Sequence, residues 1–351
     1  MQSRLFHYWL PKEMIAQALT RPRNMCRLLL CRHPSGEVGH FRFRDLPRVL
    51  PPRPIIVLNR TRVIPAKLEL RKRSGGRIEA LIVEPGGEGP PLAYLKGKVR
   101  EGVEALGEDG VILKVRRHLR EGLFEVTLSR EGEELKGRRL LEVLKEVGRM
   151  PLPPYIKRRD LPEEEYQTVY ASTDGSIAAP TAGLHFTEQL MEELKRGGAD
   201  ICYVELHVGP GTFLPLRSER VEEHKMEGER YFIPPQEAEG IKSGLEEGRP
   251  LVAVGTTTVR ALESASSSGH LRRTDGVAEV FIRPPYRFSL PYSAFITNFH
   301  LPLSTPLLLL SSFIPWERVY SLYMEAICRG YRFYSLGDAM MIIFEGGEKS
   351  V

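Results

Sequence analysis

The pattern of hydrophobic and polar residues divides the chain into two kinds of region. Between about 63 and 147, short segments of alternating apolar and polar residues are separated by glycine-rich turn sequences. A period of two residues predicts strands that are buried on one face. Such strands without a long helix between them predict a small antiparallel barrel or sandwich. The sequence RRLLEVLKEVG then predicts a short helix that ends this region.

On either side of this region, apolar runs short enough to be strands alternate with helical patterns. The expected strands are 27–33, 55–59, 201–207, 250–254, 278–282, 294–298 and 339–344. The expected helices are 10–19, 187–197, 235–247, 257–264 and 315–329. This alternation predicts an α/β domain with a largely parallel or mixed sheet. We therefore expect a mixed-sheet α/β main domain made of 1–62 and 150–351, with an antiparallel β-barrel domain inserted at 63–149.

Composition limits the class of protein further. Hydrophobic residues make up 42% of the 351 residues, which indicates a globular chain rather than a disordered one. No apolar run reaches the length of about 18 residues that a transmembrane helix needs, and the first residues lack the features of a signal peptide. The four cysteines are scattered without CxxC spacing, so neither a zinc site nor a disulfide framework is indicated. We expect a cytoplasmic protein that does not bind a membrane.

Basic residues are grouped in local clusters, although the net charge is only +5. Residues 60–77 contain seven basic side chains against the single acid Glu69, and 157–159 are basic as well. Local basic runs suit contacts with nucleic-acid phosphates. A solvated face balanced by acids from elsewhere gives the same pattern. The candidate phosphate contacts are Arg60, Arg62, Lys67, Arg71, Lys72, Arg73, Lys157 and Arg158.

Three histidines lie in turn sequences rich in Gly, Pro or Thr. They are His185 in APTAGLHFT, His207 in HVGPGTF and His300 in NFHLPLSTP. His207 and His300 follow expected strands, at the ends where α/β proteins bind ligands. Histidine suits acid–base chemistry, and the wide sequence spacing does not favour a metal site. A lone histidine is more often structural, but three such turns predict one shared pocket. We expect these imidazoles to be partly exposed, with pKa values near neutrality.

The sequence PLVAVGTTTVRALES predicts a strand, a tight turn and a helix. Threonine hydroxyls and free N–H groups at the start of a helix favour a carboxylate or phosphate, although a simple N-cap explains the pattern equally well. The spacing is not that of a phosphate loop or a dinucleotide fingerprint. The candidate ligand-binding residues here are Gly255, Thr256, Thr257, Thr258 and Arg260.

Several long segments together resemble one known family. They are YQTVYASTDGSIAAPTAGLHFT, LHVGPGTFLPLR, VAVGTTTVRALES, ITNFHLPLSTPLLLLSSF and YRFYSLGDAM. Their content and order are similar to those of the S-adenosylmethionine:tRNA ribosyltransferase-isomerase family of queuosine biosynthesis, the QueA family. The resemblance runs nearly end to end. It departs at Arg60, where the family usually has Asp or Asn, and at Lys67, where it usually has Arg.

The resemblance implies a reaction as well as a fold. Members of the family transfer and isomerise the ribosyl group of S-adenosylmethionine onto 7-aminomethyl-7-deazaguanine at the tRNA wobble position. The products are epoxyqueuosine-tRNA, adenine and methionine. S-adenosylmethionine is then a co-substrate, no metal is implied, and we expect a monomer without an obligate protein partner. The implied fold, an α/β domain with an inserted β-barrel, agrees with the expectation drawn from the hydrophobic pattern.

The resemblance also suggests what the motifs do. His185, His207 and His300 are the acid–base candidates, and Thr256–Thr258 suit the methionine carboxylate. Asn298 and Asp338 suit hydrogen bonds to ribose or base, and Tyr170 and Phe186 suit stacking on a purine. A tRNA-binding relative without activity and a methyltransferase remain alternatives. The intact motifs argue against the first, and RLLLCRHPSGEVGH is a poor nucleotide-binding turn for the second.

Overall fold

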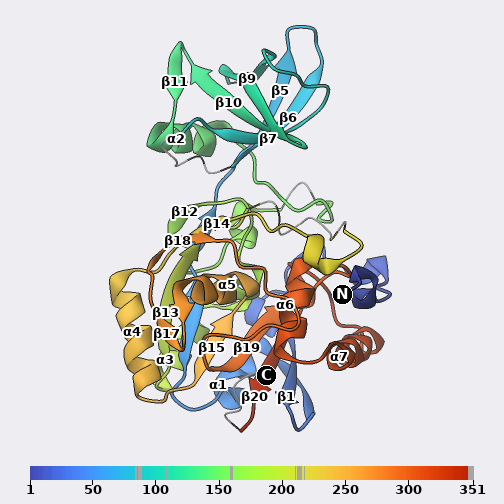
Figure 1. The fold of residues 1–351 in the computed structure, drawn as a ribbon, viewed down its shortest axis with the longest axis vertical. Coiled ribbons are helices and arrows are strands. Elements are labelled where there is room, and N and C mark those ends of the chain that lie inside the picture. The colour runs from blue at the N-terminus through green and yellow to red at the C-terminus, as the bar shows by residue number, and fades with distance from the viewer. Residues whose placement is uncertain are drawn as a thin grey trace. The chain divides into compact units, whose positions relative to one another are not determined.

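The chain divides into two compact units in the computed structural model (Figure 1). The structure describes residues 1–83, 85, 89–107, 109–158, 161–209, 211, 216 and 218–346. The larger unit comprises Met1–Thr61, Pro154–Thr173 and Ala179–Val351. The smaller unit comprises Arg62–Pro153 and Asp174–Ala178.

A nine-stranded sheet forms the centre of the larger unit, in the order β18-β14-β13-β3-β15-β19-β20-β1-β2. Its strands are β1 (Arg27–His33), β2 (Val38–Arg42), β3 (Ile55–Asn59), β13 (Asp200–Leu206), β14 (Glu229–Phe232), β15 (Leu251–Val254), β18 (Asp275–Ala278), β19 (Tyr292–Asn298) and β20 (Ala339–Phe344). Strands β13, β3, β15 and β19 are parallel, as are β1 and β20, and the remaining pairs are antiparallel. The sheet is therefore mixed, which confirms the prediction for this region.

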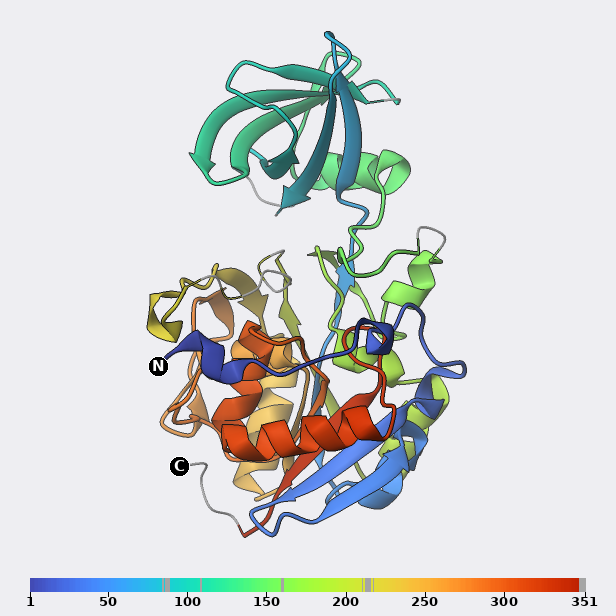
Figure 2. The same cartoon turned by 90° about the vertical axis from the view of Figure 1, so that its right-hand side faces the viewer.

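Helices cover both faces of this sheet. Strands β3 and β15 are buried at every position, as strands between two helical layers must be. On one face, α1 (Leu46–Val49) and α3 (Glu188–Arg196) join the cluster that contains Ala294 and Ile296 of β19. On the other face, α4 (Pro235–Glu246), α5 (Thr256–Ala265) and α6 (Thr305–Phe313) pack against the strands. Helix α7 (Trp316–Cys328) lies beside α6 (Figure 2).

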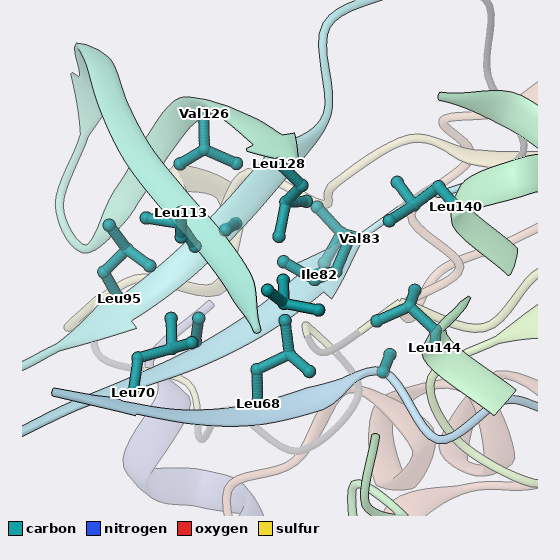
Figure 3. Close-up of a cluster of buried hydrophobic side chains, with 14 of the residues drawn as sticks. Leu68, Leu70, Ile82, Val83, Leu95, Leu113, Val126, Leu128, Leu140 and Leu144 are labelled. Atoms are coloured by element: carbon teal, nitrogen blue, oxygen red, sulfur yellow. The ribbon is translucent and has the colours of Figure 1, made fainter. Parts of the chain in front are cut away.

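The smaller unit is a separate antiparallel sheet with one helix. Its strands are β5 (Lys67–Lys72), β6 (Arg77–Val83), β7 (Leu92–Lys96), β8 (Glu104–Gly107), β9 (Val111–Arg120), β10 (Leu123–Arg130) and β11 (Glu133–Leu135). They pair in the order β11-β10-β7-β6-β5-β8-β9, and β10 also pairs with β9. Figure 3 shows the inward-facing leucines and valines of these strands meeting Leu140 and Leu144 of α2 (Gly137–Val147). This burial on alternate residues accounts for the period-two pattern in the sequence.

Two of the expected elements are wrong. The helix expected at 10–19 is only a short 3₁₀ turn, Lys12–Met14, because the chain there pairs with the segment around Phe333 through both Met14 and Ala16. The strand expected at 278–282 is displaced to β18, which ends at Ala278. The Arg260 side chain donates to the main-chain oxygens of Ala278, the last residue of this strand, and of Val280 beyond it. Within the described ranges, no helix is long and apolar enough to cross a bilayer.

Candidate active site

The polar candidates gather at one edge of the nine-stranded sheet. The parallel strands β13, β3, β15 and β19 all end there, next to His207, Arg60, Gly255 and His300 respectively. Strands β20 and β1 begin at the same edge, since Asn298 and Leu28 are both in register with Ala339. In α/β sheets, ligands bind outside the carboxyl ends of the strands. This edge is therefore the candidate active site.

His185 lies at the end of the 3₁₀ turn Thr181–His185 and is completely buried. Its Nε2 lies 3.0 Å from Nδ2 of Asn298, and its Nδ1 lies 3.2 Å from Sγ of Cys26. The hydroxyl of Thr181 donates to Oδ1 of Asn298 at 3.0 Å. Burial is the main cause that lowers the pKa of His185 to about 3. The imidazole is therefore neutral at physiological pH.

His300 is buried as well, but on the opposite face of the sheet. Its Nε2 lies 2.9 Å from the hydroxyl of Thr297, whereas His185 contacts the next residue of β19, Asn298. Successive side chains of a strand point to opposite faces. The main chain of His300 is held by the hydroxyls of Tyr8 and Tyr323. Burial lowers the pKa of His300 to about 3.

The expectation that the three histidines share one partly exposed pocket is wrong. His185 and His300 lie on opposite faces of β19, and burial moves both pKa values far below neutrality. His207 is half-buried at the end of β13, and β3 and β15 separate it from β19. Three strand spacings correspond to about 14 Å. Of the turn that follows His207, residues 210 and 212–215 lie outside the described ranges.

The turn between β15 and α5 matches the strand–turn–helix prediction. Gly255 has a φ of 87°, a conformation that favours glycine, and α5 begins at the next residue. The hydroxyl of Thr258 donates to the carbonyl of Val254 at 2.6 Å, and Thr257 Oγ1 accepts from Asn59 at 3.3 Å. Thr256 is half-buried at the edge of the sheet. The hydroxyls of Thr257 and Thr258 thus hold the turn, while the first N–H groups of α5 form an electropositive helix end.

Arg260 and Glu229 form a buried ion pair behind this turn. Arg260 also donates to the carbonyl of Ala278 at 2.7 Å, and its pKa is lowered to about 10 by burial, so it stays charged. The other carboxylate oxygen of Glu229 accepts from the main-chain N–H of Gly209 at 2.7 Å. The pair thus connects α5 to the turn that begins at His207. Glu229 gave no sequence signal, because its partners are distant in the chain.

Asp338 and Asn59 tie neighbouring strands together at this edge. The two carboxylate oxygens of Asp338 accept from the main-chain N–H groups of Arg27 and Arg332, at 2.9 and 2.8 Å. Asn59 exchanges hydrogen bonds with both main-chain groups of Leu206. Asn59 was not among the residues expected from the sequence, although a polar residue at the end of the apolar run IIVLN was a usable signal. Among the described residues, no group of three His, Cys, Asp or Glu side chains is arranged to hold a metal ion.

Many of the candidate phosphate-binding residues have acidic partners within their own unit. In the larger unit, Arg60 pairs with Glu205 at 2.8 Å and with Glu237 at 3.6 Å. In the smaller unit, the pairs are Arg62–Asp174, Lys67–Glu79 and Arg73–Glu104, and Lys72 donates to the carbonyl of Lys98. Arg71 and Lys157 are exposed, Arg158 is half-buried, and Arg159 lies outside the described ranges. The basic stretch is thus partly neutralised by acids that are distant in the sequence.

The aromatic candidates occupy different environments. Phe186 is fully buried, and its ring packs edge-on against Phe43 at 5.0 Å between centroids. The structure therefore makes Phe186 a core residue, and the expectation that it stacks on a purine is wrong. The ring of Tyr170 also packs edge-on against Phe186, at 6.3 Å between centroids.

Comparisons with known proteins agree with this architecture. A family model described as "Queuosine biosynthesis protein" matches residues 3–342. Proteins named S-adenosylmethionine:tRNA ribosyltransferase-isomerase from Anaeromyxobacter dehalogenans and Thermus thermophilus are each 44% identical, over 96% of this chain and 98% of theirs. The crystal structure of an S-adenosylmethionine tRNA ribosyltransferase from Thermotoga maritima is similar, with a TM-score of 0.55, 30% identity, and coverage of 97% of this chain and 100% of that one. The chain belongs to the queuosine biosynthesis family.

Proposed function

We propose that this protein is an S-adenosylmethionine:tRNA ribosyltransferase-isomerase. The observation that carries this function is 44% identity to relatives of that name over 96% of the chain. The enzyme transfers and isomerises the ribosyl group of S-adenosylmethionine onto 7-aminomethyl-7-deazaguanine at the tRNA wobble position. Epoxyqueuosine-tRNA, adenine and methionine are the products. A cytoplasmic location and action as a monomer complete the proposal.

S-adenosylmethionine binds, in this proposal, along the carboxyl edge of β15 and β19. The N–H groups at the start of α5, around the half-buried Thr256, bind the methionine carboxylate, because a helix N-terminus favours an anion. Gly255 lets the chain turn sharply there, and Asn59 and Thr258 hold the turn in place. The nucleoside part then lies toward Asn298, at the end of β19.

His207 is the acid–base candidate that touches substrate in this proposal. It is half-buried, whereas His185 and His300 are enclosed and neutral. The reaction needs a base for the proton beside the sulfonium and an acid for the departing adenine, and a histidine near solvent can serve either role. His185 and His300 then act by positioning the end of β19, through Asn298 and Thr297. Arg260 and Asp338 support the same edge from behind.

The smaller unit is proposed to be an inserted β-barrel domain, corresponding to the expected range 63–149, that contacts tRNA. The pairing of β10 with both β7 and β9 supports a closed barrel, since the ladder returns to its starting strand. Exposed basic residues of this unit, such as Arg71 and Arg73, suit phosphate contacts. Lys157 of the larger unit is a further phosphate contact in this proposal.

Mass spectrometry of nucleosides tests the proposed reaction. Purified protein is incubated with S-adenosylmethionine and tRNA that carries 7-aminomethyl-7-deazaguanine, and tRNA with unmodified guanine at the same position serves as the control. The expected result is conversion of the modified nucleoside to epoxyqueuosine, with equal amounts of adenine and methionine released. A gain of one methyl group would show a methyltransferase instead. Tight tRNA binding without any conversion would show a non-catalytic relative.

A further inference from the structure

Four polar side chains form one continuous hydrogen-bonded chain at the end of β19. In order they are Cys26, His185, Asn298 and Thr181, and their successive polar atoms lie 3.2, 3.0 and 3.0 Å apart. The first three are at most 3% exposed, whereas Thr181 is half-buried. Only the Thr181 end of this chain can therefore meet a ligand at the edge of the sheet.

The direction of the hydrogen bonds in this chain follows from the amide of Asn298. Its Nδ2 lies 3.5 Å from the main-chain oxygen of Asp338, which can only accept, as well as 3.0 Å from Nε2 of His185. The NH₂ group must therefore face these two atoms, so Nε2 of His185 accepts. A neutral imidazole then carries its proton on Nδ1, directed at Sγ of Cys26. At the other end, Oδ1 of Asn298 accepts the hydroxyl proton of Thr181.

We infer that Thr181 is a substrate-binding residue that accepts a hydrogen bond from a neutral N–H or O–H group of the nucleoside part of S-adenosylmethionine, and that Cys26 is a positioning residue that acts through His185 and Asn298. The reason is that the single hydroxyl proton of Thr181 is committed to Asn298, so only its lone pairs can face a ligand. This inference rests on the proposed function for the identity of the ligand. The direction of the hydrogen bonds from Thr181 to Cys26 does not depend on that function.

The 3₁₀ turn that bears Thr181 and His185 is packed too tightly to rearrange easily. A Cβ on Gly183, in the middle of this turn, would lie 1.9 Å from the hydroxyl of Tyr170. The ring of Phe43 packs against the His185 imidazole at 5.2 Å between centroids. Together with the hydrogen-bond contacts of Thr181 and His185 to Asn298, these contacts fix the turn relative to β19. The acceptor of Thr181 is therefore preorganised rather than formed on binding.

The direction of the chain is tested by the tautomer of His185, independently of any activity. In a ¹⁵N-labelled sample near neutral pH, two-bond ¹⁵N–¹H correlations distinguish the Nδ1–H from the Nε2–H form, and the His185→Gln variant assigns the signals. We expect the Nδ1–H form. Cys26→Ala leaves the Nδ1 proton without an acceptor, so the Asn298 amide should turn over in part of the molecules and Nε2–H signals should appear, whereas Cys26→Ser and the control Cys31→Ser should keep Nδ1–H. An Nε2–H wild type would overturn the direction, and an unchanged Cys26→Ala spectrum would overturn the role of Cys26.

The role of Thr181 is tested with S-adenosylhomocysteine as an unreactive ligand in calorimetry. Thr181→Val keeps the shape but removes the acceptor, and it should weaken binding about tenfold, while Thr181→Ser should stay within about twofold of wild type. If the adenine amine is the donor, S-inosylhomocysteine should bind both proteins equally. If a ribose hydroxyl is the donor, the 2′- or 3′-deoxy analogue should do so instead. Equal binding of S-adenosylhomocysteine to wild type and Thr181→Val would overturn the inference. So would a result in which every analogue still binds wild type more tightly than Thr181→Val.

Failure of this inference and failure of the proposed function give different results. If Thr181→Val binds S-adenosylhomocysteine normally while the wild type makes epoxyqueuosine, the inference alone is wrong. If S-adenosylhomocysteine binds and depends on Thr181 but tRNA is not modified, the proposed reaction is wrong and the binding role of Thr181 stands.

Discussion

The buried histidines make the stability of the larger unit depend on pH. His185 and His300 each have a pKa lowered by burial from 6.5 to about 3 in the folded protein. Unfolding returns each ring to water, where it binds a proton below about pH 6.5. The contribution of the two neutral, buried histidines to the free energy of unfolding is therefore complete above pH 6.5 and is lost as the pH falls toward 3. Each ring should remove about 1.4 kcal/mol of unfolding free energy per pH unit in this window.

Between pH 7.5 and 5.0 this amounts to about 2 kcal/mol for each histidine and about 4 kcal/mol for both. Urea denaturation followed by tryptophan fluorescence measures the loss, because Trp9 and Trp316 are the two tryptophans of the chain and both belong to the larger unit. His185→Gln and His300→Gln should each lose about 2 kcal/mol less than wild type over this pH range. The control His7→Gln, at an exposed site, should follow wild type. Equal pH dependence in wild type and both buried-site variants would refute the reasoning.

Further predictions concern the supports of the site and its ligands. Glu229→Ala should destabilise the larger unit by about 3–5 kcal/mol, because it leaves Arg260 as a buried unpaired charge, and urea denaturation should show a smaller loss when Arg260→Met is added. Gly255→Ala should cost about 1–2 kcal/mol in the same assay, since its φ of 87° strains any residue with a Cβ. His207→Ala should lower kcat about 100-fold or more with little change in stability, and normal turnover would exclude it as the acid or base. tRNA affinity should fall steeply with salt, and Arg71→Ala should reduce that dependence; a flat salt profile would argue against phosphate contacts.

The elements that could be predicted are those whose burial is evident from the local pattern of hydrophobic and polar residues. Strands β3 and β15 are continuous apolar runs because helices cover both faces, and the period-two segments became the separate antiparallel sheet. The helix expected at 10–19 failed because pairing with the segment around Phe333 outweighs local helix propensity. Local pattern cannot contain such a distant partner.

The candidate site shows the same limit. Strand order places His207, Gly255 and Asn298 at one edge, as turns after parallel strands predict. The face of the sheet on which a side chain lies depends on its position in the strand. His185 and His300 therefore lie on opposite faces, because they contact Asn298 and Thr297, which are successive residues of β19. The roles of Cys26 and Glu229 depend on His185 and Arg260, which lie 159 and 31 residues away from them in the sequence. Long-range contacts, rather than residue type, decide these roles.

The central claim, that this protein transfers the ribosyl group of S-adenosylmethionine to tRNA, can be tested most directly by isotope transfer. Two samples of S-adenosylmethionine are used, one with ¹³C in the ribosyl carbons and one with ¹³C in the methyl group. Each is incubated with the protein and tRNA that carries 7-aminomethyl-7-deazaguanine, and the tRNA nucleosides are then analysed by mass spectrometry. All five ribosyl carbons should appear in the modified nucleoside, and none of the methyl label. Transfer of the methyl label, or of neither label, would contradict the claim.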